Sequence, residues 1–64
     1  MTAGIAIYLP APASLSLTRL LADAGGIKMS QTAWVIPVLD LNKHLPALTQ
    51  VGREGGHTTP YVKP

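Results

Sequence analysis

Short apolar stretches alternate with amphipathic ones along this chain, and the stretch in its middle carries most of the information. Residues 27–39 read IKMSQTAWVIPVL, contain the only tryptophan, and lie between Gly25-Gly26 and Asp40. The first half is polar on one side of an extended chain, whereas the half from Trp34 onward is almost entirely apolar. Two interpretations fit: one strand that passes from partly to fully covered, or two strands joined by a turn or bulge near Ser30-Gln31-Thr32.

The second half of this stretch predicts a contact between copies. Pro37 has no backbone N–H to donate, so it indicates an edge, a bulge or a strand end at that point. The run from Trp34 to Leu39 is too apolar for the surface of so small a monomer. We therefore expect Trp34 and its neighbours to complete a core that one copy cannot close.

Helical periodicity precedes this stretch. Four apolar residues recur at i, i+3, i+4 and i+7, which is the spacing of one helix face: Leu17, Leu20, Leu21 and Ala24. Ser14 or Ser16 can cap the start of this helix, and Gly25 is the natural left-handed residue just past its end.

A second helical stripe follows the central stretch, formed by Leu41, Leu45, Leu48 and Val51. Asp40 or Asn42 can cap a helix here, but a start at Asn42 would place Pro46 beyond the first turn, where it costs a backbone hydrogen bond. The alternative is a helix from Leu45 with Pro46 at its first position. Gly52 and Gly55-Gly56 are expected to end it.

The two ends of the chain complete the pattern. Gly4 to Leu9 is apolar and stops at Pro10, as a strand buried on both faces would. We assign residues 1–56 to a single domain, and residues 57–64, polar apart from Tyr61-Val62, to a tail or an edge strand. The order of elements predicts a small ferredoxin-like α+β sandwich, with helices on one face of an antiparallel sheet and the other face free to pair with a second copy.

Composition points to a partner as well. A chain of 64 residues buries only about 60% of its unfolded surface, so its core is marginal. It has no cysteine, which excludes disulfides and thiolate metal sites as support. Only 12% of its residues are charged, about half the usual 25%, while 47% are hydrophobic. Oligomerisation or docking on a larger molecule is the remaining form of support.

Charge and hydropathy narrow the classes of partner. The formal net charge is +2, and the five cations are spread about one per segment rather than clustered as in a dedicated nucleic-acid binder. No apolar run approaches the roughly 18–20 residues that a bilayer requires, and the start of the chain lacks the basic region of a signal peptide. We expect a cytoplasmic protein, in the host cytoplasm if it is phage-encoded, with no membrane partner.

The succession of segments resembles the small Cas2-like ferredoxin-fold proteins. The features that carry the resemblance are an apolar first strand, a leucine-bearing helix that ends in Gly-Gly, the segment Gln31-Thr32-Ala33-Trp34 in the central hairpin, and a leucine-striped second helix. Members that cut nucleic acid carry an aspartate at the end of the first strand, whereas this strand ends Tyr8-Leu9-Pro10. The resemblance therefore implies a non-catalytic relative that dimerises through its sheet.

Candidate chemistry in the sequence is sparse. Asp40 and His44 are spaced i, i+4 and His57 offers a third metal ligand, but a helix cap and an exposed histidine explain the pair better. No serine lies in a Gly-x-Ser-x-Gly elbow, and none of the three carboxylates neighbours another in sequence. The glycine-rich segment 52–56 lacks the lysine of a phosphate-binding loop. We predict no enzyme, no metal and no cofactor.

The sequence thus predicts a small non-enzymatic binding protein that forms a homo-oligomer, most simply a dimer, and docks on another macromolecule. Its size and composition suit a phage- or plasmid-encoded inhibitor or accessory protein. The candidate partner-binding residues are Trp34, Tyr8, Ile36, Tyr61 and Arg53. The alternative is a Cas2-like nucleic-acid-binding protein that contacts phosphates through Lys28, Arg53 and Lys63.

Overall fold

Four strands, two α-helices and one 3₁₀ turn follow one another in a computed structural model of the protein, which describes residues 2–63. Their bounds are β1 Thr2–Tyr8, α1 Leu15–Asp23, β2 Ile27–Ser30, β3 Ala33–Pro37, η1 Leu41–His44, α2 Leu45–Arg53 and β4 His57–Lys63.

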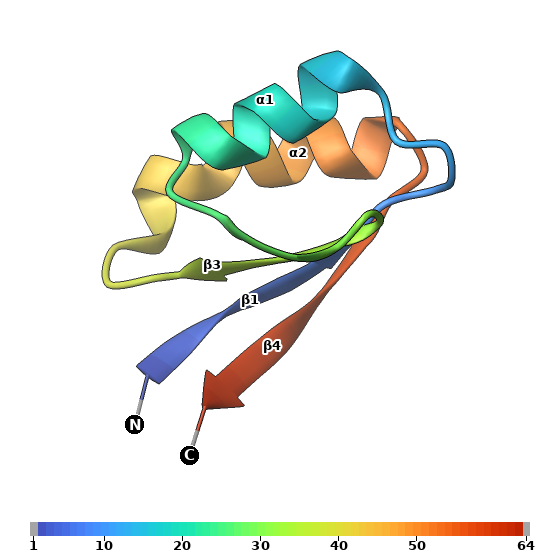
Figure 1. The fold of residues 1–64 in the computed structure, drawn as a ribbon. Helices are drawn as coiled ribbons and strands as arrows, with labels where there is room; N and C mark the ends of the chain where they lie inside the picture. The colour runs from blue at the N-terminus through green and yellow to red at the C-terminus, as the bar shows by residue number, and fades with distance from the viewer. Residues whose placement is uncertain (1, 64) are drawn as a thin grey trace.

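The strands form one antiparallel sheet in the order β2-β3-β1-β4, with β1 and β3 in the interior. Both α-helices lie on the same side of this sheet, and no element formed by residues 2–63 covers the other side (Figure 1). This arrangement is compatible with a small ferredoxin-like α+β fold, and it confirms the predicted fold class.

The central stretch is a hairpin rather than one long strand. β2 and β3 pair on either side of a turn at Gln31-Thr32, and their register shifts between Lys28 and Ser30. Pro37 is the last residue of β3, where a missing N–H costs the ladder least. The two-strand interpretation and the strand end at Pro37 are therefore both confirmed.

The first helix begins and ends as its sequence predicts. The Ser14 hydroxyl caps α1 by accepting a hydrogen bond from the Leu17 backbone N–H at 3.2 Å. Gly25 follows the helix with a φ of +84°, the left-handed conformation that glycine adopts without strain.

The second helix combines the two predicted starts. Asp40 caps a 3₁₀ turn by accepting from the Asn42 N–H at 3.1 Å, and α2 then begins at Leu45 with Pro46 in its first turn. Gly52 lies inside α2, so the expectation that it ends the helix is wrong. α2 ends at Arg53, and Gly55, just past the C-cap residue Glu54, has a φ of +87°.

The core lies between the sheet and the helices. The sheet supplies core side chains from two strands, and the helical layer supplies them from both α-helices. They are Ile7 in β1 and Leu9 just after it, Trp34 and Ile36 in β3, Leu17 and Leu21 in α1, and Ala47 and Val51 in α2. All of these side chains are buried within a single copy of the chain.

Trp34 belongs to this core, which corrects one expectation. The β1–β3 register places Trp34 opposite Ile7 and Ile36 opposite Ile5, on the side that the helices cover. Trp34 is 6% exposed and Ile36 is fully buried. The expectation that Trp34 and Ile36 await a second copy to cover them is therefore wrong.

The C-terminal segment is an edge strand. β4 pairs with β1 along its whole length, from Tyr8 opposite His57 to Thr2 opposite Lys63. Of the two alternatives for residues 57–64, the strand is the one observed for 57–63, and Pro64 lies outside the described residues.

Candidate interaction surface

The side of the sheet opposite the helices presents a surface that we call the open face. Because side chains alternate along a strand, the register that turns Ile7, Trp34 and Ile36 toward the helices turns their neighbours away. The open face consists of Ile27 and Met29 from β2, Ala33, Val35 and Pro37 from β3, Gly4, Ala6 and Tyr8 from β1, and His57, Thr59 and Tyr61 from β4.

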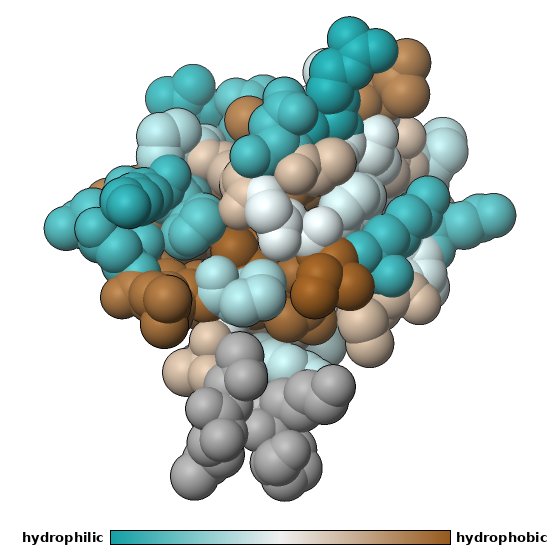
Figure 2. Space-filling view, turned by 60° about the vertical axis from the view of Figure 1, so that its left-hand side comes forward, coloured by the Kyte–Doolittle hydropathy of each residue, from teal (hydrophilic) through white to brown (hydrophobic). Residues whose placement is uncertain are grey.

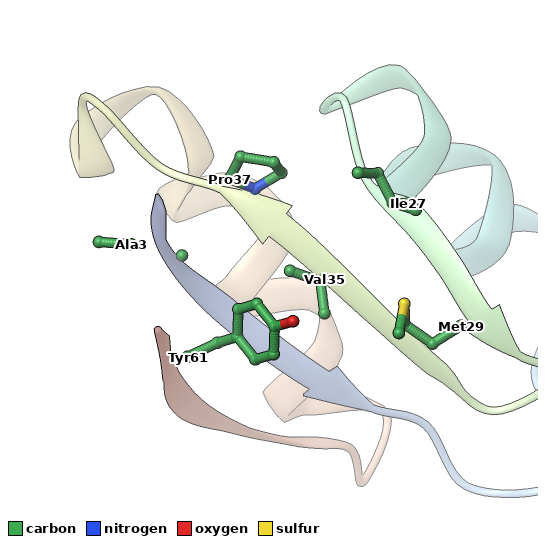
Figure 3. Close-up of a pocket in the computed structure, with 7 residues that line it drawn as sticks. Ala3, Ile27, Met29, Val35, Pro37 and Tyr61 are labelled. Carbon is green, nitrogen blue, oxygen red and sulfur yellow. The ribbon is translucent and has the colours of Figure 1, made fainter. Parts of the chain in front are cut away.

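A hollow of about 270 Å³ lies on the open face. Figure 3 shows the Tyr61 ring lying across β1 with its hydroxyl toward Val35, while Ile27 and Met29 stand on the far side of the hollow. Ala3, Gly4 and Pro37 complete its lining. The hollow is therefore bordered by one aromatic and several aliphatic side chains.

Gly4 keeps this region of the sheet open. A Cβ atom at position 4 would lie 2.5 Å from the Ile36 carbonyl oxygen, a distance that real Cβ atoms do not tolerate. Tyr61 is the direct partner of Gly4 across the β1–β4 ladder. Glycine at position 4 therefore lets β1 pass close to the backbone of β3 beside the hollow.

A pair of stacked rings occupies the other end of the open face. Tyr8 and His57 pair across β1 and β4, with ring centroids 5.0 Å apart and an angle of 22° between the planes. Tyr8 is 39% exposed. The hollow and the ring pair thus lie at opposite ends of the same strand, β1.

Two large apolar side chains of the open face are exposed to solvent. Ile27 is 56% exposed and Met29 is 60% exposed, and both border the hollow. Exposed apolar side chains that gather on one surface usually mark a contact with another molecule. Neither was among the candidate partner-binding residues, although the alternation of Ile27 and Met29 with Lys28 and Ser30 was a signal for a half-covered edge strand.

The two edges of the sheet are poor places for strand addition. β4 contains Pro60, which cannot donate to a further ladder, and β2 has only four residues, one of them Lys28, with a register shift. Proline, lysine, short length and irregular register are common means of preventing edge-to-edge pairing. A partner is therefore better accommodated by the open face than by either edge.

The remaining candidate residues are dispersed. Tyr8 and Tyr61 lie on the open face, whereas Trp34 and Ile36 lie in the core and Arg53 is exposed at the end of α2. Of the three candidate phosphate contacts, Lys28 pairs with Trp34 on the β2 edge, and Lys63 pairs with Thr2 at the end of the opposite edge strand. The fold does not bring Lys28, Arg53 and Lys63 to one end of the sheet.

The candidate metal ligands are also separate. Asp40 caps η1, and His57 stacks on Tyr8 on the open face. The His44 Nδ1 atom and the Trp34 Nε1 atom are buried without a hydrogen-bond partner. Within residues 2–63, no group of three histidine, aspartate or glutamate side chains is arranged to hold a metal ion.

Comparison with known proteins finds no matching family model, no significantly similar curated protein and no significantly similar solved structure. Neither α-helix in the described part of the chain has the length and hydropathy needed to cross a membrane.

Proposed function

We propose that this protein is a non-enzymatic binding protein that pairs with a second copy through its open face and docks, as that pair, on another protein. The observation that carries the proposal is the exposure of Ile27 and Met29 beside an apolar hollow on the open face. A second copy suits such a surface, since in a two-fold pair the same apolar side chains of each copy cover those of the other.

The size of the open face sets the strength of the pair. Its two longest strands have seven residues, which extend about 23 Å, and four strands side by side span about 19 Å. A face of this size belongs to the small interfaces that bury less than about 1,200 Å² in total and are weak. We therefore expect a dissociation constant in the micromolar range, which corresponds to about 8 kcal/mol.

A second exposed apolar surface is left for the protein partner. Leu39 in the loop after β3 is fully exposed, and Leu41 in η1 and Leu45 at the start of α2 are about half exposed. Figure 2, in which the side carrying this loop comes forward, shows hydrophobic surface gathered below a mostly hydrophilic upper part. Because these leucines lie outside the four strands, they remain available in the pair, in the cytoplasm of a cell or of an infected host.

A substitution on the open face tests the pairing. Burying Met29 is worth about 1.5–3 kcal/mol, so Met29→Glu should weaken self-association by about tenfold or more. Leu15→Glu is the matched control, because Leu15 is 74% exposed but lies on α1, away from the open face. Sedimentation equilibrium from micromolar to millimolar concentration should show dimers for the unaltered protein and for Leu15→Glu. A monomer throughout this range, or a Met29→Glu variant that pairs as well as Leu15→Glu, contradicts the proposal.

Nucleic-acid binding of the Cas2-like type is the second candidate, and one observation favours it. Tyr8, His57 and Tyr61 are ring-bearing side chains on the open face of a four-stranded sheet, and some RNA-binding modules stack bases on aromatic side chains of such a face. The dispersed positions of Lys28, Arg53 and Lys63 favour the protein interface instead. A salt titration separates the two, since phosphate binding weakens steeply with salt whereas apolar self-association does not.

A further inference from the structure

We infer that a hollow on the helix side of the sheet binds a small molecule that carries both an oxyanion and a hydroxyl group, as a sugar phosphate or a sugar acid does. This hollow, which we call the polar hollow, is lined by residues 11–13 of the loop after β1, Thr18 of α1, Lys28 of β2, and Gln31 and Thr32 of the turn between β2 and β3. The inference goes beyond the proposed function and does not depend on the pairing of two copies.

The polar hollow lies apart from the open face. Lys28 pairs with Trp34 across the β2–β3 ladder, and directly paired residues of two strands lie on the same side of a sheet. Trp34 packs in the core under the helices, so Lys28 is on the helix side of β2. Its neighbour Ile27 pairs with Val35 and borders the hollow of the open face. A ligand at Lys28 therefore leaves the open face free.

The walls of the polar hollow are fixed by contacts within the chain. The Leu9 N–H donates to the Thr32 carbonyl oxygen at 2.7 Å, which ties the loop after β1 to the turn of the hairpin. Figure 1 shows this loop and this turn at the same end of the sheet. The Thr32 N–H donates to the Ser30 hydroxyl at 3.3 Å, and Ala13 packs against the core. A preformed site of this kind avoids the cost of ordering loops when a ligand binds.

The charge of the polar hollow favours an anion. Lys28 is the only charged residue among those that line it, and no aspartate or glutamate accompanies it. Gln31 and Thr32 are residue types that donate neutral hydrogen bonds. The Glu54 carboxylate accepts from the Ser14 hydroxyl at 3.4 Å and is not part of the lining. An ammonium group with neutral donors beside it binds a carboxylate or a phosphate through charge-assisted hydrogen bonds.

Thr18 accounts for the hydroxyl group of the ligand. The Thr18 hydroxyl donates to the Leu15 carbonyl oxygen at 2.9 Å, so its oxygen can only accept from a ligand. An oxyanion has no hydrogen to offer to this oxygen, whereas an alcohol has one. A molecule with both groups can therefore bond Lys28 at one wall and Thr18 at another.

The volume of the polar hollow limits the size of the ligand. It is about 510 Å³, within the range of about 300–1,000 Å³ that is typical of small-molecule sites. Lys28 is exposed, so water reaches this wall and competes for its ammonium group. We therefore expect a dissociation constant of about a millimolar for a monosaccharide that carries one oxyanion.

Mapping of amide chemical shifts on the full chain tests the site. Ribose 5-phosphate and gluconate, each added to about 20 mM, should shift the signals of Thr18, Lys28 and Gln31. Ribose lacks the oxyanion and inorganic phosphate lacks an alcohol, so each should bind about threefold or more weakly than ribose 5-phosphate. The relative affinities of ribose 5-phosphate and gluconate show whether phosphate or carboxylate is preferred. Shifts that are absent from the polar hollow, or equal for ribose and ribose 5-phosphate, overturn the inference.

Substitution of Lys28 tests the anion contact. Lys28→Gln should weaken the binding of ribose 5-phosphate by about fivefold or more, because it removes the charge and keeps a polar side chain. Lys43→Gln is the matched control, since Lys43 is also exposed but lies in η1, outside the lining. Its affinity for ribose 5-phosphate should be unchanged. Equal losses in the two variants would show attraction to the overall positive charge instead of a site, and would refute the inference.

Substitution of Thr18 tests the hydroxyl contact. Thr18→Val replaces the hydroxyl with a methyl group of similar size, so it should weaken ribose 5-phosphate by about threefold and leave inorganic phosphate unchanged. The dispersion of the amide signals shows whether the variant is folded. Equal effects on the two probes would contradict the assignment of Thr18, and the shift map of the unaltered chain tests the location of the site independently of either variant.

Discussion

Gly26 makes room for the tryptophan that anchors the core. A Cβ atom at position 26 would lie 2.9 Å from the Trp34 ring and 2.7 Å from the Leu21 carbonyl oxygen. The backbone between α1 and β2 therefore passes so close to Trp34 that only glycine fits. Gly52 is different, because a Cβ there meets nothing within 4 Å and the residue lies inside α2.

Alanine at these two glycines should change stability in opposite directions. Gly26→Ala is expected to destabilise the fold by about 1–3 kcal/mol, as overpacking does. Gly52→Ala is expected to stabilise it by about 0.5–1 kcal/mol, because glycine is unfavourable within a helix. Urea unfolding monitored by Trp34 fluorescence gives both free energies. Equal shifts in the two variants would contradict the packing described around Gly26.

The first helix depends on a local cap, and this made it predictable. Ser14 accepts from the Leu17 N–H, and the apolar side chains of α1 recur at helical spacing over the core. The capping serine, the apolar helix face and the glycine after the helix all lie within twelve residues of sequence. They can therefore be recognised without knowledge of any distant contact.

Removing the Ser14 hydroxyl should cost a measurable share of stability. Ser14→Ala is expected to lower the free energy of unfolding by about 1 kcal/mol, the usual cost of an N-cap. Ser16→Ala is the control, since Ser16 lies within the helix and its exposed hydroxyl contacts only that of Ser14. Its effect should stay within about 0.5 kcal/mol in chemical denaturation. A Ser16→Ala loss as large as that of Ser14→Ala would argue against Ser14 as the cap.

The strands show where sequence alone is insufficient. The alternation of side chains along β3 puts Trp34 and Ile36 on one side of the sheet and Val35 on the other. Which side meets the helices depends on the pairing of β3 with β1, between residues that are far apart in sequence. Tyr8 and Tyr61, two of the candidate residues, lie on the open face. Trp34, which was expected to need a second copy to cover it, is buried within one, and Ile27 and Met29 were not among the candidates.

The whole molecule has two layers and covers only one side of its sheet. It measures 31 × 22 × 17 Å, and residues from both helices and from β1 and β3 supply the buried core. A second copy on the open face would give the sheet a second covering layer, so that folding and pairing would be thermodynamically linked.

This linkage predicts a melting temperature that depends on protein concentration. Above the dissociation constant of the pair, Tm should rise by about 3–6 °C for each tenfold increase in concentration. Differential scanning calorimetry of the unaltered protein and of Met29→Glu measures the effect, which should be much smaller in the variant. A Tm that is constant across concentration in both proteins would show that the open face stays unpaired.

The position of β4 has a consequence for synthesis on the ribosome. β1 lies between β3 and β4, yet β4 is the last of these four strands to be made. Until residues 57–63 emerge, the first strand has an unprotected edge that carries apolar side chains and no proline. The nascent chain is therefore most prone to mispairing just before its final strand is released, and shortening the chain before His57 would make that hazard permanent.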